Sequence, residues 1–500
     1  MNKKRFLFPL YILFCLFSAQ AQELFDALSF SELPTQGTAR AMSMSGAFGA
    51  LGGEPTSLIT NPAGLGIYRS CEATLSLYNN YSQHKTATNF NDNNRITLSQ
   101  ASYVHSILPK NKVLIASNFA VSFNRLKNFQ NKYTFDNNAS ASIVNYMAEQ
   151  ANGISENALL ESNNPFDNPQ IGRLAALGYG NYLIKPSGLK QWKPMTYAQV
   201  ASKYKCVESG SIDEFNVSYA VNLAHWVYLG ASVGIQSLEK TTTSLYTENF
   251  YSLNEEELQL KNRLTFSGVG MNFKIGAIVR PVSFLRIGFA YHTPTFYAIS
   301  QYSTTDLESR NVLDEKSNLV DVSSSTGDNS DSYHFRTPSR YLFSAAFIIN
   351  KKGLIDVDYE LVDYRSMRYS DDFSTDGFYN ENKFIRNYAK INHTLKIGGE
   401  YRVLDFLSLR VGGAFATPTE DSSAAKTLPQ NSIRTDLESL ATSWSYNVSC
   451  GIGFRWTYWG IDLAYQYNQQ YATFTPFTGA KQASLTNDYH NILLTGSFRF

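Results

Sequence analysis

The sequence has little charge and almost no cysteine. Asp, Glu, Lys and Arg make up 17% of its 500 residues, and the formal net charge is +1. Because there is no basic surplus, bulk charge gives no reason to expect a nucleic-acid partner. Of the four cysteines, Cys15 lies near the N-terminus, and Cys71, Cys206 and Cys450 are widely spaced. That spacing argues against both a disulfide framework and a zinc ribbon.

Long apolar runs are also missing beyond the first residues. After residue 21, no stretch approaches the roughly 18 consecutive apolar residues that a membrane-spanning helix needs. The first residues run from a basic cluster at 3–5 through an apolar stretch at 6–17 to Ala19-Gln20-Ala21. This is the pattern of a secretory signal peptide, and we expect residues 1–21 to be removed.

Aromatic residues are abundant, with 32 Tyr and 33 Phe. The last residues alternate, and one side of a strand over 488–500 would carry Ile492, Leu494, Gly496, Phe498 and Phe500. Asn491, Leu493, Thr495, Ser497 and Arg499 would lie on the other side. The alternation predicts a strand of an outer-membrane β-barrel in a Gram-negative bacterium, with the edge strand of a soluble sheet as the alternative. A closing Phe resembles the signal for outer-membrane assembly, so the barrel-assembly machinery is an expected partner.

Six short turns alternate with seven longer polar connections, which gives a count of fourteen strands. We therefore predict an all-β fold, a 14-stranded antiparallel transmembrane barrel. The strands are expected near 71–81, 96–108, 112–124, 212–223, 227–238, 263–279, 284–300, 334–349, 354–366, 388–402, 407–418, 443–456, 458–472 and 488–500.

The chain divides into three parts on this interpretation. After the signal peptide we expect an N-terminal hatch segment over 22–70 and the barrel over 71–500, with long extracellular loops. The longest loop, 125–211, is too long to be bare, and local helical character is found at 139–150 and 171–177. Small helices packed at the extracellular mouth are predicted there.

Charged residues within the predicted strands indicate which face looks inward. Asp356, Asp358 and Glu360 share one face of the strand 354–366. A charge facing lipid is costly, so these carboxylates should face the lumen. The same reasoning places three basic residues inside, namely Arg286, Lys396 and Arg410. Acid-base catalysis is the alternative for the carboxylates, but they have no obvious reactive partner.

Residues 28–67 are unusually rich in glycine and alanine, with Gly46 and Gly49 among seven glycines. A dinucleotide-binding loop is disfavoured because no hydrophobic strand precedes the glycines and no βαβ unit follows. Small residues permit close backbone packing, which suits a segment folded inside a barrel.

The run Thr38-Ala39-Arg40-Ala41-Met42-Ser43-Met44-Ser45-Gly46-Ala47-Phe48, followed by Asn61-Pro62-Ala63-Gly64-Leu65, resembles the N-terminal hatch of FadL-like outer-membrane transporters. These proteins carry long-chain fatty acids and other hydrophobic compounds. The resemblance implies a hatch, or plug, inside the lumen and a hydrophobic ligand site between hatch and wall. It also implies lateral escape of the ligand at a kinked third strand, here 112–124, where Asn118 and Asn124 interrupt the apolar run.

The leading functional hypothesis is passive uptake of a hydrophobic small molecule through a barrel seated in outer-membrane lipid. The second is a platform role in protein secretion or surface-protein attachment, with secretion-system proteins as partners. An outer-membrane hydrolase is the third, but there is no Gly-x-Ser-x-Gly motif, and the seven histidines are dispersed. We therefore expect no catalytic residues, no metal site and no cofactor.

Overall fold

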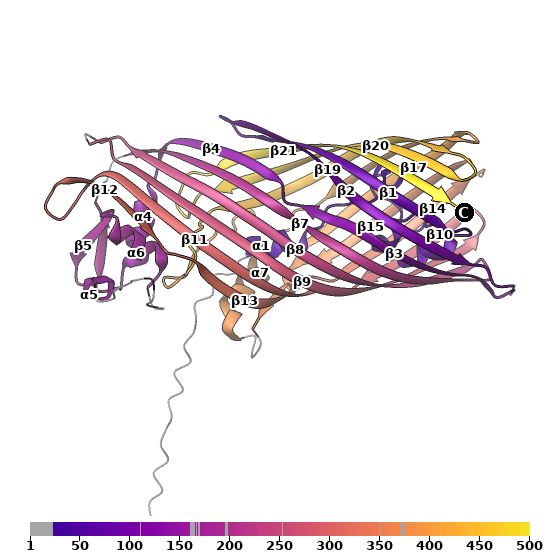
Figure 1. Ribbon diagram of the computed structural model, residues 1–500, viewed down its shortest axis with the longest axis horizontal. Helices are drawn as coiled ribbons and strands as arrows, with labels where there is room; N and C mark the ends of the chain where they lie inside the picture. The colour runs from indigo at the N-terminus through magenta and orange to yellow at the C-terminus, as the bar shows by residue number, and fades with distance from the viewer. Residues whose placement is uncertain are drawn as a thin grey trace, which may run out of the picture.

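Antiparallel strands close on themselves into a long barrel (Figure 1). The computed structural model describes residues 24–110, 112–160, 166, 168, 171–195, 199–252, 254–350, 352–371 and 376–500, so the expected signal peptide lies outside the described residues. The wall consists of β1 (Glu72–Lys85), β2 (Phe90–Ile107), β3 (Leu114–Asn128), β4 (Asn131–Ser140), β7 (Val200–Leu223), β8 (Val227–Phe250), β9 (Glu257–Val282), β10 (Leu285–His292), β11 (Phe296–Leu313), β12 (Leu319–Ser325), β13 (Asn329–Arg336), β14 (Arg340–Ile349), β15 (Gly353–Asp363), β16 (Arg368–Ser370), β17 (Ile391–Leu404), β18 (Leu407–Ala416), β19 (Ser439–Arg455), β20 (Trp459–Thr475) and β21 (Ala483–Arg499).

Several of these segments continue one another along the wall. β3 continues as β4, β10 as β11, β12 through β13 to β14, and β15 as β16. The 19 strands of the sheet therefore form fourteen continuous wall strands, which we call staves. β1 pairs with β2 on one side and with β21 on the other, so no edge remains. The predicted fold class, a closed 14-strand antiparallel barrel with an N-terminal plug, is confirmed.

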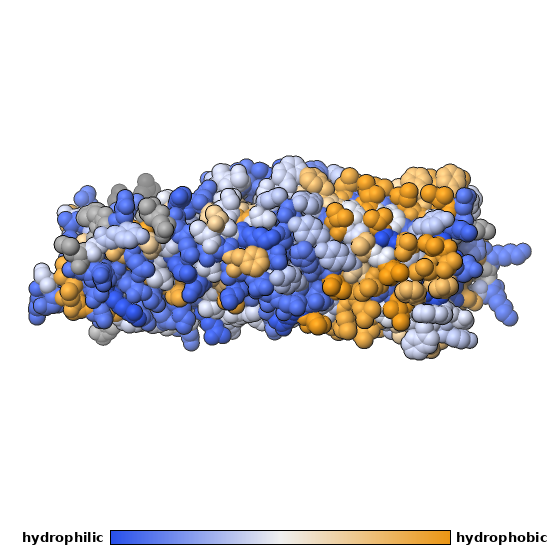
Figure 2. All heavy atoms as spheres, turned by 90° about the horizontal axis from the view of Figure 1, so that it is seen from above, coloured by the Kyte–Doolittle hydropathy of each residue, from blue (hydrophilic) through white to orange (hydrophobic). Residues whose placement is uncertain are grey.

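Short turns gather at the end of the barrel that holds the C-terminus. Neighbouring turns are joined by backbone hydrogen bonds, among them Ala224 to Val113, Arg280 to Trp226 and Arg499 to Tyr458. Above these turns a band of apolar side chains covers the outside of the wall, as Figure 2 shows toward the C-terminal end. Outward apolar and inward polar side chains are the arrangement required of a barrel in a bilayer. We call this band the lipid belt.

The wall strands reach farther than predicted. The expected loop at 239–262 is mostly strand, because β8 continues to Phe250 and β9 begins at Glu257. The expected loop over 125–211 likewise contains β4 and the first part of β7. These extensions stand above the lipid belt, where the outside of the barrel is polar (Figure 2).

A folded cap lies at the end of the barrel opposite the C-terminus (Figure 1). It comprises α4 (Ile143–Ala151), α5 (Glu156–Leu160), α6 (Arg173–Gly180), β5 (Ile184–Gly188) and β6 (Gln191–Pro194). α4 and α6 lie where helices were predicted. α4 begins because the Ser142 hydroxyl accepts a hydrogen bond from the Val144 N–H, an N-cap. Met147, Leu177 and Trp192 belong to its buried core.

The remaining helices lie in the N-terminal segment and beside β16. The helices of the N-terminal segment are α1 (Leu24–Ser31), α2 (Ala39–Met42), α3 (Ser57–Thr60) and the 3₁₀ helix η1 (Pro62–Ile67). The helices beside β16 are η3 (Tyr364–Ser366), η4 (Asp376–Phe378) and α7 (Tyr379–Tyr388). Residues 24–68 are mostly buried within the barrel, and we call them the plug. Among the described helices, none has the length and apolarity to cross a membrane.

Candidate functional site in the plugged lumen

Wall side chains hold the plug by its backbone. The Asp358 carboxylate accepts hydrogen bonds at 3.0 Å from the backbone N–H groups of Phe48 and Gly49. The Arg286 guanidinium, from β10, donates to the Leu51 carbonyl at 2.6 Å. Hydrogen bonds in which one partner is ionised are about twice as strong as neutral ones. Two of the predicted lumen-lining residues therefore fix the centre of the plug.

Two glycines of the predicted hatch motif allow this arrangement. A Cβ atom at Gly49 would lie 1.9 Å from the Ser344 hydroxyl oxygen and 2.8 Å from Asp358 Oδ1. Gly46 has a positive φ of 78°, which glycine adopts without the steric cost of a side chain. Close approach at one position and a left-handed backbone at the other explain why small residues occur here.

The second half of the predicted motif shapes the start of η1. The Asn61 side-chain oxygen accepts from the Ala63 N–H at 3.1 Å, and its amide donates to the Gly49 carbonyl at 2.7 Å. Pro62 occupies the first position of η1, where a missing N–H has little consequence. A Cβ on Gly64 would lie 2.8 Å from a backbone atom of the plug. The motif thus ties the two halves of the plug together.

A chain of alternating charges connects the plug to the wall. Arg40 of the plug pairs with Glu400 at 2.9 Å, and Arg410 lies between Glu400 at 2.5 Å and Asp462 at 2.6 Å. All four side chains are largely buried, so removing one partner would leave an uncompensated buried charge. The sequence predicted the inward position of Arg410 but gave no signal for its link to Arg40.

The remaining predicted wall residues lie at different depths. Glu360 pairs with Lys396 at 3.0 Å and with Arg340 at 2.9 Å, and Arg340 also donates to the Ser31 carbonyl at the end of α1. Asp356, on the same strand as Glu360, is fully buried nearer the turn that precedes the strand. The structure therefore separates the predicted set into a plug-holding level and a level near α1.

The first helix of the plug is anchored by ionic contacts at both ends. Asp26 pairs at 2.5 Å with Arg434, a fully buried arginine that also pairs with Asp436. At the other end, the Lys127 ammonium donates to the Ser29 carbonyl at 2.8 Å. Cations near a helix C-terminus are favourable because its last carbonyls carry partial negative charge.

Above the centre of the plug lies a cavity of about 490 Å³ within the barrel. Its lining is amphipathic: apolar side chains come from the plug and the upper wall, and they include Leu28, Leu33, Phe129, Tyr133 and Phe474. Charged side chains of both signs also face it: the basic ones are Lys127, Lys240, Arg340, Lys396 and Lys426, and the acidic ones are Asp26, Glu32, Glu208, Glu360, Glu420, Asp436 and Glu438. Most of the basic side chains pair with these carboxylates, whereas Lys127 forms no salt bridge among the described residues. A cavity with apolar and charged parts suits an amphipathic molecule.

Lys127 and Lys240 approach the same aromatic ring. Each ammonium lies 5.4 Å from the centre of the Phe129 ring, a cation–π distance. Lys240 also pairs with Glu208 at 3.2 Å. The sequence prediction missed this cluster because it assigned 125–211 to a loop, so no face could be assigned to Lys127 or Phe129.

The third stave shows an interruption in its pairing. Among the described residues, the ladder between β2 and β3 runs from Gln100–Asn124 to Ile107–Ser117, whereas β3 pairs with β7 as far as Asn128. Asn124 therefore marks the upper end of the β2–β3 ladder. Asn118, the other predicted interruption, donates instead to the Leu65 carbonyl of the plug at 2.7 Å.

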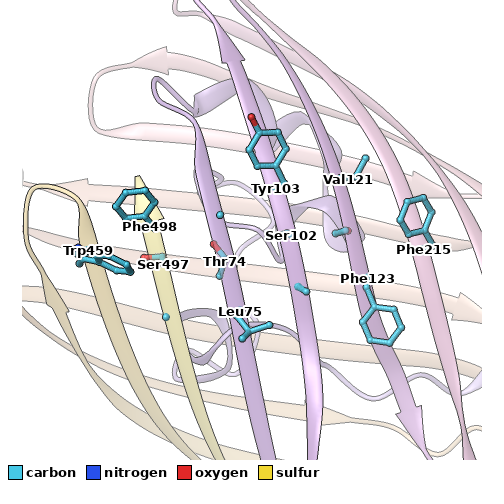
Figure 3. A pocket seen from close by; sticks show the side chains of 14 residues that line it. Thr74, Leu75, Ser102, Tyr103, Val121, Phe123, Phe215, Trp459, Ser497 and Phe498 are labelled. Atoms are coloured by element: carbon cyan, nitrogen blue, oxygen red, sulfur yellow. The ribbon is translucent and has the colours of Figure 1, made fainter. Parts of the chain in front are cut away.

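The outside of the wall is hollowed beside this interruption. A depression of about 590 Å³ crosses β1, β2, β3 and β21, and Figure 3 shows Tyr103, Phe123, Phe215 and Phe498 around it. Small outward residues, Ala73 and Gly496 among them, line it. Lipid chains therefore meet a hollow next to the place where β2 and β3 part.

Within the described part of the chain, no three His, Cys, Asp or Glu residues gather in a way that could hold a metal ion.

No family model and no curated protein sequence matches the chain. Solved structures do match its fold. A FadL homologue from Pseudomonas aeruginosa superposes with a TM-score of 0.54 at 13% identity, covering 94% of this chain and 100% of that one. The toluene transporter TodX of P. putida superposes with a TM-score of 0.50 at 13% identity, covering 94% and 99%.

The closed barrel with its lipid belt defines an integral outer-membrane protein. Within that class the chain has the FadL-like fold that the hatch motif suggested. At 13% identity the likeness establishes the fold, and the lumen itself has to supply the argument for function.

Proposed function

We propose that the protein takes up hydrophobic small molecules by passive passage through the barrel. The observation that carries the proposal is the amphipathic cavity inside the barrel, above the centre of a plug held by hydrogen bonds and ion pairs. Such contacts can exchange for water one at a time, so the plug can shift without unfolding the wall. No chemical step is required.

The cavity favours a ligand of the fatty-acid type. A carboxylate can approach the Lys127 and Lys240 ammonium groups while an acyl chain lies against Leu28, Leu33 and Phe129. Charge-assisted hydrogen bonds would hold the anionic end. The apolar side chains would hold the rest of the chain by area burial.

The proposed exit is lateral, at the seam between β2 and β3. The ladder between these strands ends at Gln100 and Asn124, and the outer depression lies directly beside them. Asn118 of this stave donates a hydrogen bond to the plug, so a shift of the plug would change the contacts of β3 beside the seam. An apolar ligand released there would enter lipid rather than water.

A reversible cross-link between plug and wall tests the proposal. The hydroxyls of Ser45 and Ser449 lie 2.8 Å apart, so Ser45→Cys with Ser449→Cys should form a disulfide. Cys450→Ser removes a competing thiol. We expect oxidised cells that carry this variant to lose uptake of radiolabelled oleate and to regain it on reduction. Unchanged uptake in the cross-linked state would reject passage controlled by the plug.

A charge deletion tests the ligand class. Lys127→Met should lower oleate uptake about tenfold, because a charged hydrogen bond is lost, and should spare the uncharged alcohol of the same length. Lys132→Met, an exposed lysine on the adjacent β4, is the matched control. Equal loss of uptake for the acid and the alcohol would contradict a carboxylate contact at Lys127. It would not contradict the proposal that the protein takes up hydrophobic molecules.

The folded cap favours a second function, as a platform for protein secretion or surface attachment. It is a folded unit that shares one buried core with the upper wall strands, and it lies at the end of the barrel opposite the C-terminus (Figure 1). Deleting residues 143–194 would separate the two functions. Loss of co-purifying secretion components with retained oleate uptake would support the platform, and the reverse pattern would support transport alone.

A further inference from the structure

We infer that the outer face of the barrel binds the phosphate group of an outer-leaflet lipid. The site is a groove of about 770 Å³ that crosses the outside of β8, β9, β11, β13 and β16 and ends at α7. Three arginines from β13, β16 and α7 line it, namely Arg336, Arg368 and Arg386. We call it the arginine groove. It lies outside the lumen, and the inference does not depend on transport.

Strand pairing fixes the height of the groove on the wall. One cross-strand row runs from Ile235 through Met271 and Phe296 to Arg336 and Arg368. Ile235, Met271 and Phe296 are 48%, 45% and 59% exposed, so their side chains point outward. The two arginines thus stand level with outward apolar side chains of the lipid belt.

The row two residues higher is mixed, and the next row is polar. Val269 and Ala298 face outward in the first of these, in line with His334. In the second, Glu239, Ser267, Ser300 and Ser332 follow one another across the same strands. The belt therefore ends at this height. The arginines lie where lipid headgroups meet acyl chains.

The arginines are close to one another on the outside of the wall. Arg368 experiences the positive charge of both Arg336 and Arg386, opposed by Asp363, which itself pairs with Arg365 at 2.8 Å. Within the described residues, none of the three forms a salt bridge. Arg368 and Arg336 instead donate to backbone carbonyls of 365–367, which directs them toward the groove.

This combination fits a phosphorylated lipid better than solvent or a neutral lipid. A guanidinium presents a planar pair of donors that matches phosphate oxygens, and three such groups repel one another unless an anion lies between them. Acyl chains of the same molecule would lie against Val269, Met271 and Phe296, which are exposed on the outside of the wall. Tyr379, 59% exposed on α7, closes the other side of the groove.

Native mass spectrometry of the detergent-solubilised protein tests the inference. The probes are lipid A, which carries phosphates, and the same lipid after dephosphorylation. We expect lipid A adducts on the wild type and weaker binding by about fivefold for each arginine removed in Arg336→Gln, Arg368→Gln and Arg386→Gln. Dephosphorylated lipid should bind wild type and triple variant equally.

Two controls keep the outcome interpretable. A triple variant of exposed arginines elsewhere, Arg69→Gln, Arg310→Gln and Arg402→Gln, makes the same charge change and should bind like wild type. Arg368 holds backbone carbonyls, so Arg386→Gln alone, on the exposed face of α7, covers the case in which the triple variant fails to fold. Heat-modifiable gel migration reports folding.

Three results would overturn the inference: equal lipid A binding by the folded triple variant, equal loss in the control variant, and unchanged binding by Arg386→Gln when the triple variant is unfolded. Full displacement of lipid A by inorganic phosphate at equal concentration would also overturn it. That outcome would mean that the groove recognises the free anion without the acyl chains.

Discussion

The lower and upper halves of a single strand, β7, have opposite polarity. Near the short turns, its outward side chains Phe215, Val217 and Tyr219 are apolar, and inward Asn216 and Ser218 are polar and buried. In the upper half the outward positions carry exposed lysines, and the inward positions carry buried Tyr204 and Cys206. The same inversion occurs along β8, where Ile235 faces out and Tyr246 is buried.

The difference teaches that the solvent around the wall decides which face is apolar. In lipid the outside must be apolar, and the inside can be polar because side chains and plug hydrogen-bond there. Above the bilayer the outside meets water, and the inside becomes a conventional hydrophobic core. One continuous stave thus serves as a membrane strand below and as part of a soluble domain above.

The largest expected effect breaks the upper half of this comparison. Phe474 is buried in the upper interior, with its ring centre 3.8 Å from that of Phe135 and 4.8 Å from that of Tyr204. Phe474→Ala should destabilise the upper barrel by about 3–5 kcal/mol, as large-to-small core substitutions do. Denaturant unfolding followed by near-ultraviolet circular dichroism would measure it.

Phe289→Ala is the matched control in the lower half. Phe289 faces outward and is 40% exposed, so lipid tails can fill the space that the ring leaves. Phe289→Ala should lower the free energy of unfolding by much less than Phe474→Ala does. Equal costs would mean that the upper interior is not a hydrophobic core.

The second effect tests the inversion on one strand with one substitution. Val217→Arg places a charge in the lipid belt and should cost about 2–4 kcal/mol, whereas Val207→Arg, outward and 50% exposed in the upper half, should change stability by less than about 0.5 kcal/mol. Urea unfolding of protein refolded into phosphatidylcholine vesicles distinguishes them. Similar values for both sites would place the upper half in lipid too.

The third effect concerns the plug, which occupies the polar interior of the lower half. Asp358→Asn keeps the shape of the side chain but replaces the charged acceptor for the Phe48 and Gly49 amides, at a cost of about 1–3 kcal/mol. We expect faster hydrogen exchange over residues 46–52. Asp314→Asn, in the loop after β11, is the control and should leave exchange there unchanged.

The smallest effect is a pH dependence of the loop that joins β18 to β19. Burial, reinforced by the nearby Glu32 carboxylate, raises the pKa of Glu420 from 4.5 to about 7. Because the folded pKa is the higher one, the protonated form stabilises the loop, fully below about pH 4.5 and less as the pH rises through 7. The protection of amides at 417–438 against hydrogen exchange, relative to their intrinsic rates at each pH, should therefore decrease across that range.

Glu420→Gln provides the control for this titration. The amide has no proton to release, so the protection of the loop, corrected for the intrinsic pH dependence of amide exchange, should become insensitive to pH between 4.5 and 7. A variant that keeps the full pH dependence would assign the titration to another group.

The sequence predicted the fourteen staves because the lower strand halves carry the regular alternation that lipid imposes. Leu494 is outward as expected, and the turn between the strands predicted at 212–223 and 227–238 lies where predicted. The upper halves were mistaken for loops because a strand with a polar outside and an apolar inside has no hydrophobic belt to detect. Thr241 to Ser244, between Lys240 and Leu245, gave no membrane signal, yet they are strand.

The candidate site was predictable only where a motif or a misplaced charge marked it. Asn61 and Gly49 stood out as parts of a small-residue motif, and Asp358 stood out as a charge in a strand. The contact between Asp358 and Gly49 joins residues 309 positions apart in the sequence, and no local pattern encodes such a pairing. Lys127 and Phe129 were missed for the same reason, together with their assignment to a loop.

The anchorage of the plug has a mechanical consequence. One end is clamped at the top by the ion pair between Asp26 and Arg434, and the other end continues covalently into β1 at the base. Between these points the plug behaves as a strap with two fixed ends, which can bow sideways but cannot be swept out. In the proposed transport, any opening that the plug makes would therefore be limited in size, and the plug would return to its place after the ligand has passed.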